Sequence, residues 1–195
     1  MRRAGFVAAA ILVMAAVWAG ITRPWARLPV LPIGGEFALT DHNGARFQLS
    51  QLRGKVVLVF FGYSMCPDVC PTTLSKLSVV ARRLGEDAAK VKTIYVTVDP
   101  ERDTPEALKV DLQNFRLDAL GLTGSRVAVD SVAHLFGATY KINPTPESAA
   151  KYTVTHTTTL YALDAHGRAR MTFPYEASVD EIVAGIQRII AAEGM

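Results

Sequence analysis

The sequence contains little charge and very little cysteine. Charged residues make up 20% of its 195 residues, the net charge is +3, and there are two cysteines. No basic run occurs beyond the extreme N-terminus, and we therefore expect no nucleic-acid partner. There is also no internal repeat and no low-complexity tract. The length suits one domain with a substantial core plus an extension.

The N-terminus is the one long apolar stretch. Arg2 and Arg3 precede an uncharged run over residues 4–22, close to the roughly 17–25 residues that cross a bilayer as a helix. A cleaved signal peptide is the alternative, but its apolar region is usually shorter. We therefore expect a membrane anchor or signal segment over 1–25, a tether over 26–35 and a domain over 36–195. A short basic N-terminus normally stays inside, which predicts a bacterial inner-membrane protein whose domain faces the periplasm or outer side.

Both cysteines lie in one short loop. The apolar run 56–61 predicts a strand buried on both faces, and Cys66 and Cys70 follow it directly. Pro71 is suited to the first position of a helix. Because the N-terminus of a helix favours anions, a thiolate at this junction is stabilised and its pKa is lowered. The pattern indicates sulfur chemistry.

The spacing of the two cysteines leaves three interpretations open. Side chains four positions apart share a face if the loop is helix-like, so the sulfurs can form a disulfide, exchange disulfides with a partner, or bind one metal ion. A purely structural disulfide would close a very small loop and restrict the unfolded chain little.

The rest of the chain predicts an α/β domain. Strands, turns and helix caps follow one another in the order expected for a thioredoxin-like fold with an extra N-terminal β-hairpin and an inserted helix, preceded by one transmembrane anchor. The first expected elements are a hairpin over 37–48 with an Asn43-Gly44 turn, a helix that can start at Pro71, shows helical spacing over 74–84 and ends at Gly85, and a strand over 91–98. They are followed by a helix from Pro105 to about 115 with Thr104 as its N-cap, a helix from Ser125 to 136 and an exposed loop over 141–151. The last are a hairpin of 157–163 and 168–173 and a final helix capped by Ser178 and Glu181.

His156 is the histidine best placed to join the cysteines. Of the four histidines, His42 and His166 lie in predicted turns and His134 on a predicted helix. His156 is expected to open the strand 157–163, beside the cysteine loop. Two thiolates and one imidazole suit Cu(I) and tolerate Cu(II), and they suit zinc with water as the fourth ligand.

Several segments of the chain resemble the Sco/SenC family. They are Phe60–Tyr63, Cys66–Pro71, Val98–Thr104, Gly121–Gly124 and Tyr152–Thr157, and the resemblance covers residues 36–192. Members of that family are membrane-anchored, thioredoxin-like copper proteins that help to assemble the binuclear copper site of cytochrome c oxidase. The resemblance implies that Cys66, Cys70 and His156 bind copper, as Cu(I), Cu(II) or both. It also implies three kinds of partner: the oxidase subunit carrying that site, a periplasmic copper chaperone or thiol reductant, and the membrane.

One residue departs from the family pattern. Thr155 stands where the family usually has Asp before the histidine. The missing negative charge bears on the preference between Cu(I) and Cu(II). Asp68 and Asp99 are candidates for supporting residues around the metal.

Two other functions remain open from the sequence. Cys66 and Cys70 would be the catalytic redox pair of a thiol–disulfide reductase that keeps the oxidase copper-ligand cysteines reduced. The two-residue spacing of ordinary thioredoxins is absent, however, and no proline opens the strand at 157–163. A peroxidase is disfavoured because Pro67 stands where the reactive-cysteine motif needs Thr. Whether the chain turns over a substrate as an enzyme stays undecided.

Overall fold

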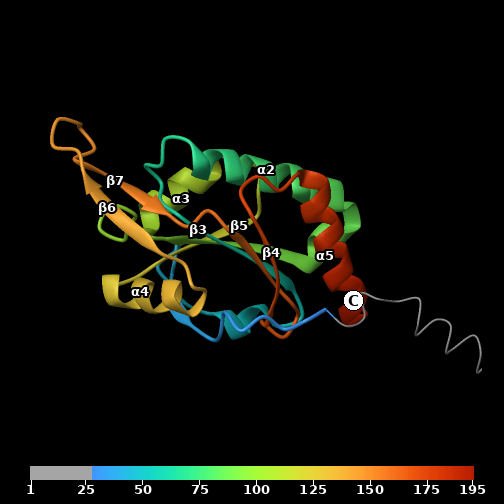
Figure 1. Ribbon diagram of the computed structural model, residues 1–195. Helices are drawn as coiled ribbons and strands as arrows, with labels where there is room; N and C mark the ends of the chain where they lie inside the picture. Colours follow the sequence, from blue (N-terminus) through green and yellow to red (C-terminus); the bar gives the residue numbers. More distant parts are fainter. Residues whose placement is uncertain (1–27) are drawn as a thin grey trace, which may run out of the picture.

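The structure is a computed structural model that describes residues 28–195. The predicted membrane anchor over 1–25 lies outside the described residues. Within 28–195, no helix is both long and apolar enough to span a membrane. A seven-stranded sheet has the order β2-β1-β5-β4-β3-β8-β9, and β6 and β7 form a separate two-stranded sheet (Figure 1).

The strands and helices alternate along the chain as in an α/β fold. The strands are β1 (Ala38–Asp41), β2 (Arg46–Gln48), β3 (Val56–Gly62), β4 (Val91–Thr97), β5 (Ala119–Thr123), β6 (Tyr140–Pro144), β7 (Tyr152–His156), β8 (Leu160–Leu163) and β9 (Ala169–Phe173). The helices are α2 (Val69–Leu84), α3 (Pro105–Gln113), α4 (Arg126–Leu135) and α5 (Val179–Glu193), with short 3₁₀ turns η2 (Leu49–Leu52) and η3 (Gly85–Lys90).

Strand β3 is the centre of the core. All seven of its residues are buried, as expected for an apolar strand with both faces covered. It pairs in parallel with β4 and antiparallel with β8. Helices α2 and α5 cover one face of the sheet and α4 covers the other (Figure 1). Alternate side chains follow these faces: Phe60 stacks on Tyr95, while Phe61 meets Phe136 edge to face.

The helix caps predicted from the sequence are confirmed. Thr104 and Ser125 each accept a hydrogen bond from a backbone N–H in the first turn of their helices, and Ser178 and Glu181 form a capping box. Gly85 ends α2 with a positive φ of 57°. Helix α2 begins at Val69, two residues before the predicted first position Pro71, and therefore includes Cys70 in its first turn.

Strand β5 has no counterpart among the predicted elements. It is short and contains Gly121, and glycine weakens the sequence signal of a strand. Gly121 is needed for close packing, since a Cβ there would lie 2.9 Å from Leu112 Cδ1 on α3. The strand pairs with both β4 and β1, so it joins the N-terminal hairpin to the central sheet.

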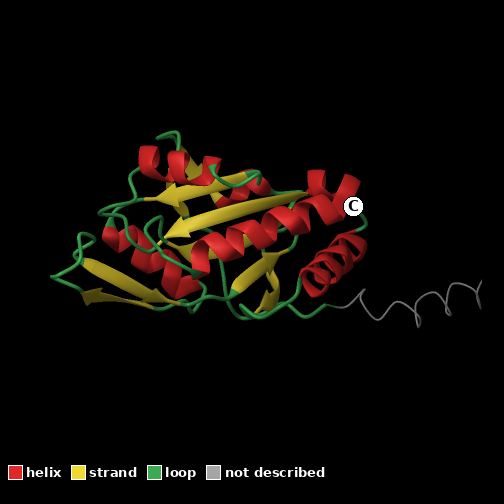
Figure 2. Cartoon of the chain, turned by 90° about the horizontal axis from the view of Figure 1, so that it is seen from above, coloured by secondary structure: helices red, strands yellow, loops and turns green. Residues whose placement is uncertain are grey.

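The exposed loop predicted over 141–151 is wrong in its first part. Residues 140–144 form β6 and pair with β7, in the register Tyr140↔His156. This hairpin extends from one end of the molecule, away from the C-terminus (Figure 2). It was missed because polar residues and Pro144 interrupt its apolar pattern, and a single one of its ten residues, Val154, is buried. The predicted strand 157–163 is wrong at its start as well: His156 ends β7, and β8 begins only at Leu160.

Residues 28–35, the described part of the predicted tether, lie against the domain. They have no regular secondary structure. The N–H of Leu31 donates to Ala169 O at 2.8 Å, the N–H of Gly34 donates to Leu135 O at 2.6 Å, and Arg170 Nε donates to Pro29 O at 3.2 Å. The entry of the chain is thereby fixed at β9 and α4.

Asp111 on α3 predicts a pH dependence of stability. Burial first, and then the nearby Asp103 carboxylate, raise the pKa of Asp111 to about 6. The folded state therefore binds this proton more tightly than the unfolded state, and the contribution of Asp111 to stability falls as the pH rises from about 4 to about 6. We expect Asp111→Asn to be more stable than the wild type at pH 7 and equal to it near pH 4, measured by urea unfolding. An advantage of Asp111→Asn that stayed constant with pH would contradict this assignment.

Candidate metal centre

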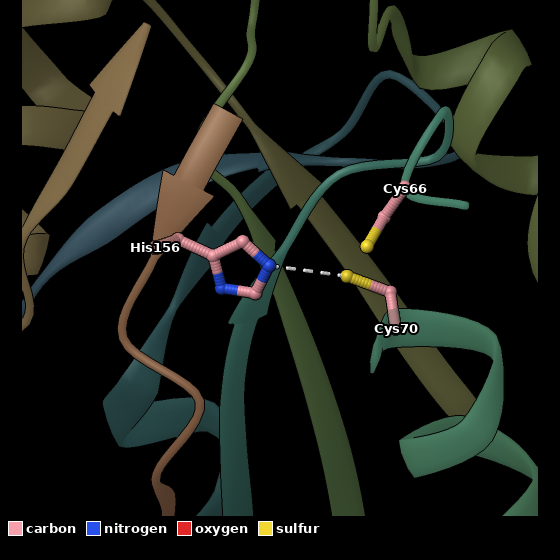
Figure 3. A group of neighbouring side chains, drawn as sticks. All are labelled: Cys66, Cys70 and His156. Atoms are coloured by element: carbon pink, nitrogen blue, oxygen red, sulfur yellow. Dashed lines mark hydrogen bonds between the residues drawn. The ribbon is translucent and has the colours of Figure 1, made fainter. Parts of the chain in front are cut away.

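Three side chains from two distant parts of the chain meet beyond the end of β3. One ligand atom from each of Cys66, Cys70 and His156 lies within 4.8 Å of the others (Figure 3). Cys70 Sγ is 3.4 Å from His156 Nε2. Within residues 28–195 this is the single group of three or more such ligands that could hold a metal ion. Both cysteines are free thiols.

The cysteine loop is fixed by a buried carboxylate. Asp103 is fully buried and accepts hydrogen bonds from the backbone N–H and the hydroxyl of Ser64 and from the hydroxyl of Thr97. Ser64 lies two residues before Cys66, whose own N–H donates to Tyr63 O at 3.1 Å. Because a buried carboxylate is costly unless it is hydrogen-bonded, these bonds hold the loop against the end of β4.

Helix α2 supplies Cys70 from its first turn. The sulfur lies directly above Gly62, the last residue of β3: a Cβ at Gly62 would be 2.7 Å from Cys70 Sγ. The same Cβ would be 2.7 Å from Tyr95 Cε2. Glycine at this position therefore lets α2 and the Tyr95 ring approach β3 closely enough to bury the sulfur.

His156 is oriented by the carbonyl of the next residue, just beyond β7, and by two aromatic rings. Its Nδ1 lies 3.0 Å from Thr157 O. In the tautomer with the proton on Nδ1, this nitrogen donates to the carbonyl and leaves Nε2 free as a metal ligand. The rings of Phe60 and Tyr63 meet the imidazole edge to face, with centroids 6.2 and 5.9 Å away.

The loop 99–104 holds the turn end of the β6–β7 hairpin, where Tyr152 pairs with Pro144. Arg102 Nη1 donates to the carbonyls of Ala150 and Tyr152 at 3.0 and 3.1 Å, and its guanidinium lies 3.7 Å over the Tyr152 ring. Asp99, fully buried, accepts from Arg102 Nε and, at 2.8 Å, from the Tyr152 hydroxyl. Asp99 thus supports the hairpin that carries His156; its hydrogen bonds go to the hairpin and the loop.

The other candidate residues lie around the site or elsewhere. Asp68 is exposed, and its side chain lines the same cavity as Cys66. Thr155 is exposed, and its hydroxyl accepts from Asn143 Nδ2 at 2.8 Å. The remaining histidines lie apart: His42 Nδ1 accepts from the N–H of Gly121, His166 faces Glu193, and His134 is exposed on α4.

The two thiols differ in charge because one donates a hydrogen bond to the other and because Cys70 is more deeply buried. A hydrogen bond from the Cys70 thiol lowers the pKa of Cys66 to about 3, helped by His156 and by the N–H groups of Asp68 and Cys70, although burial acts in the opposite direction. The same hydrogen bond, together with burial, raises the pKa of Cys70. Without metal, the pair therefore carries a thiolate on half-buried Cys66 and keeps one proton on buried Cys70.

The site is open to ligands on one side. A cavity of about 350 Å³ lies between the cysteine loop and β7 and is bordered by Tyr63, Cys66, Asp68, Val154 and His156. Three donor atoms, each about 2.0–2.3 Å from one ion, lie at most about 4.6 Å apart. The observed separations, all under 4.8 Å, therefore require little movement for a shared metal ion.

The fold and the cluster together define a thioredoxin-like domain with a candidate Cys-Cys-His metal site. The sequence model of the SCO1/SenC family matches residues 27–191. The chain therefore belongs to the SCO1/SenC family.

Relatives and solved structures agree with this assignment. The SCO2-like protein RP587 of Rickettsia prowazekii is 35% identical over 78% of this chain and 75% of its own length. The mitochondrial SCO2 homologue of Homo sapiens is 36% identical over 81% of this chain, which spans 60% of that protein. The structure of Bradyrhizobium japonicum ScoI with copper bound has 41% identity and a TM-score of 0.73, covering 80% of this chain and 99% of ScoI. Yeast Sco1 has 29% identity and a TM-score of 0.76, covering 83% and 99%.

The contact between Gly62 and the buried sulfur gives a testable prediction. In Gly62→Ala, the added methyl would lie 2.7 Å from Cys70 Sγ and Tyr95 Cε2, so the helix or the ring must move. We expect a loss of about 1–3 kcal/mol in the free energy of unfolding and a displaced Cys70, detected by urea unfolding and by faster alkylation of Cys70. Gly124→Ala is the matched control, because its new methyl would meet a flexible Leu39 methyl at 3.1 Å. Equal effects of the two substitutions would contradict the prediction.

Proposed function

We propose that this chain is a copper metallochaperone that assists assembly of the binuclear copper site of cytochrome c oxidase. The observation that carries the proposal is the meeting of Cys66, Cys70 and His156 at one point beside an open cavity. Two thiolates and one imidazole form a soft ligand set that suits Cu(I) and tolerates Cu(II), although zinc would accept it as well. The copper bound in ScoI of Bradyrhizobium japonicum supports the proposal.

The different burial of the ligands suits transfer of the ion. Cys70 is 2% exposed, whereas Cys66 and His156 are half-buried. The Cys66 thiolate is ready to bind copper without losing a proton, and Cys70 then releases its proton as its sulfur binds. A partner cysteine approaching through the cavity reaches Cys66 and His156 first, so these ligands are exchanged before Cys70. The ion passes through sites that share ligands and is never released to water.

The membrane and the partners belong to the same proposal. An anchor over residues 1–25 would hold the chain in a bacterial inner membrane with the domain in the periplasm. This location would place the site near the oxidase subunit that carries the binuclear copper site, and near a periplasmic copper chaperone or thiol reductant. The apolar run at 4–22 and the flanking arginines support it.

Removing the imidazole tests the three-ligand site. We expect the reduced full chain to bind one copper ion tightly, with sulfur-to-Cu(II) charge-transfer bands, and His156→Ala to weaken binding at least 100-fold, since loss of a mere supporting residue already costs 10–100-fold. Copper titration with competing chelators measures this. His134→Ala, an exposed histidine on α4, should bind like the wild type. Full copper affinity in His156→Ala would exclude the three-ligand site.

A thiol–disulfide reductase is the second candidate. It is favoured by the state of the cysteines: a thiolate on accessible Cys66 stands beside a protonated, buried Cys70. In this function, the Cys66 thiolate attacks a partner disulfide and one partner sulfur leaves as a thiolate. Cys70, after losing its proton, then attacks the mixed disulfide, leaving the partner reduced and Cys66–Cys70 oxidised. The same pair can bind metal only after it is reduced again.

The two functions make different demands on the cysteines. Because the pKa of Cys66 is about 3, we expect iodoacetamide to modify Cys66 before Cys70 and to do so even at pH 5, as read by peptide mass spectrometry. Preferential modification of Cys70 would contradict the charge assignment. A reductase would also reduce the disulfide of a peptide carrying the oxidase copper ligands, and His156→Ala would keep that activity. If the chain reduced this peptide disulfide no faster than a free dithiol does, the reductase function would be excluded and the metallochaperone would be the remaining candidate.

A further inference from the structure

Tyr95 carries a polar atom that the fold leaves without a hydrogen-bond partner. The residue lies on β4 and is 0% exposed. Among the described residues, its hydroxyl is one of few buried side-chain atoms with no hydrogen bond. Enclosing an unpaired hydroxyl costs about 1–3 kcal/mol, and phenylalanine would fill nearly the same space without that cost. We therefore expect the Tyr95 hydroxyl to find a hydrogen-bond partner in another state of the protein.

The atom that lies beside this hydroxyl is the sulfur of Cys70. A Cβ at Gly62 would be 2.8 Å from Tyr95 Oη and 2.7 Å from Cys70 Sγ, so both atoms border the same small space beside Gly62. The Tyr95 ring is held in place by stacking on Phe60, with centroids 6.1 Å apart. The hydroxyl thus lies within the core, next to the most buried of the three candidate ligands.

The chemistry of the sulfur decides whether this contact is a hydrogen bond. A phenol at neutral pH is a donor, and a protonated thiol is a weak acceptor. A thiolate is a strong one, because hydrogen bonds to charged acceptors are about twice as strong as neutral bonds. When Cys70 loses its proton to bind a metal ion, the Tyr95 hydroxyl gains the acceptor that it lacks.

We propose that Tyr95 is a positioning residue for Cys70, donating a hydrogen bond to its metal-bound sulfur and shifting the site toward Cu(I). The copper preference in this inference rests on the proposed function. A donor on the sulfur draws electron density away from it, so the sulfur donates less to Cu(II). Hydrogen bonding around a ligating sulfur is a known means of setting copper redox preference. The proposed effect on the copper preference comes from Tyr95 and Cys70 in the positions that they already occupy.

Tyr95→Phe tests the inference on the full chain. Loss of the donor should raise the energy of the sulfur lone pairs and move the sulfur-to-Cu(II) charge-transfer band to longer wavelength. The ratio of Cu(I) to Cu(II) affinity, measured with chelators for each ion, should fall about tenfold, the worth of one charge-assisted hydrogen bond. The metal-free variant should be at least as stable as the wild type in urea, because the unpaired hydroxyl has been removed.

A matched control and a second ion complete the experiment. Tyr161→Phe removes a hydroxyl from the same core on the other face of the sheet, where the ring packs on Phe61 and Phe136, and should change neither band nor affinity ratio. Co(II) gives a thiolate charge-transfer band of its own, and this band should shift in Tyr95→Phe as well. If the Co(II) band shifted in Tyr95→Phe but the chain did not bind copper tightly, the proposed copper function would be overturned, whereas the hydrogen bond from Tyr95 to the metal-bound sulfur would be supported. Unshifted bands in a copper-binding chain, or equal shifts in both variants, would overturn the inference, and a chain that bound neither ion would overturn both.

Discussion

The loop 99–104 is the part of the structure on which the candidate site depends. Its Asp103 carboxylate holds the cysteine loop through Ser64, and its Asp99–Arg102 pair holds the start of β7 at the turn end of the β6–β7 hairpin. The ligands come from both sides, two from the cysteine loop and α2 and one from the hairpin. Asp99 and Asp103 are fully buried, and breaking a buried charged pair such as Asp99–Arg102 costs about 3–5 kcal/mol. The loop therefore helps to fix the two sulfurs and the imidazole relative to one another before any ion arrives.

The site combines a rigid ligand with accessible ones. Cys70 is part of a helix that packs on the central strand, and its sulfur is buried in the core because Gly62 has no side chain to exclude it. Cys66 lies in the loop outside that helix and borders the cavity, as does His156 at the end of a hairpin that pairs with no strand of the main sheet. A site that must both hold and release an ion needs this combination, because ligands can be exchanged only where a partner can reach them.

The sequence predicted best those features that local chemistry determines. Caps, the buried strand 56–61 and the clustered cysteines follow from residue types over a few positions, and all are present. The β6–β7 hairpin was missed because its own residues show little apolar pattern and because the hydrogen bonds from Arg102 and to Asp99 that hold it come from 48–53 residues away in sequence. His156 was singled out only by element order and family resemblance, and its placement at the start of a strand was wrong. No sequence pattern marked the buried contact of Tyr95 with Cys70, because it arises from two strands and a helix meeting at Gly62.

The position of Tyr95 bears on the residue that departs from the family pattern. An Asp before the histidine would place a negative charge near the imidazole, but Thr155 is exposed and bonded to Asn143 on the neighbouring strand. The electrostatic influence on a bound metal then comes less from the exposed side of the hairpin, where Thr155 lies, and more from Tyr95 in the core beside Cys70. A carboxylate favours the more highly charged Cu(II), whereas a donor to sulfur favours Cu(I). In the proposed copper site, the absence of the carboxylate and the presence of the Tyr95 donor would therefore both favour Cu(I) over Cu(II).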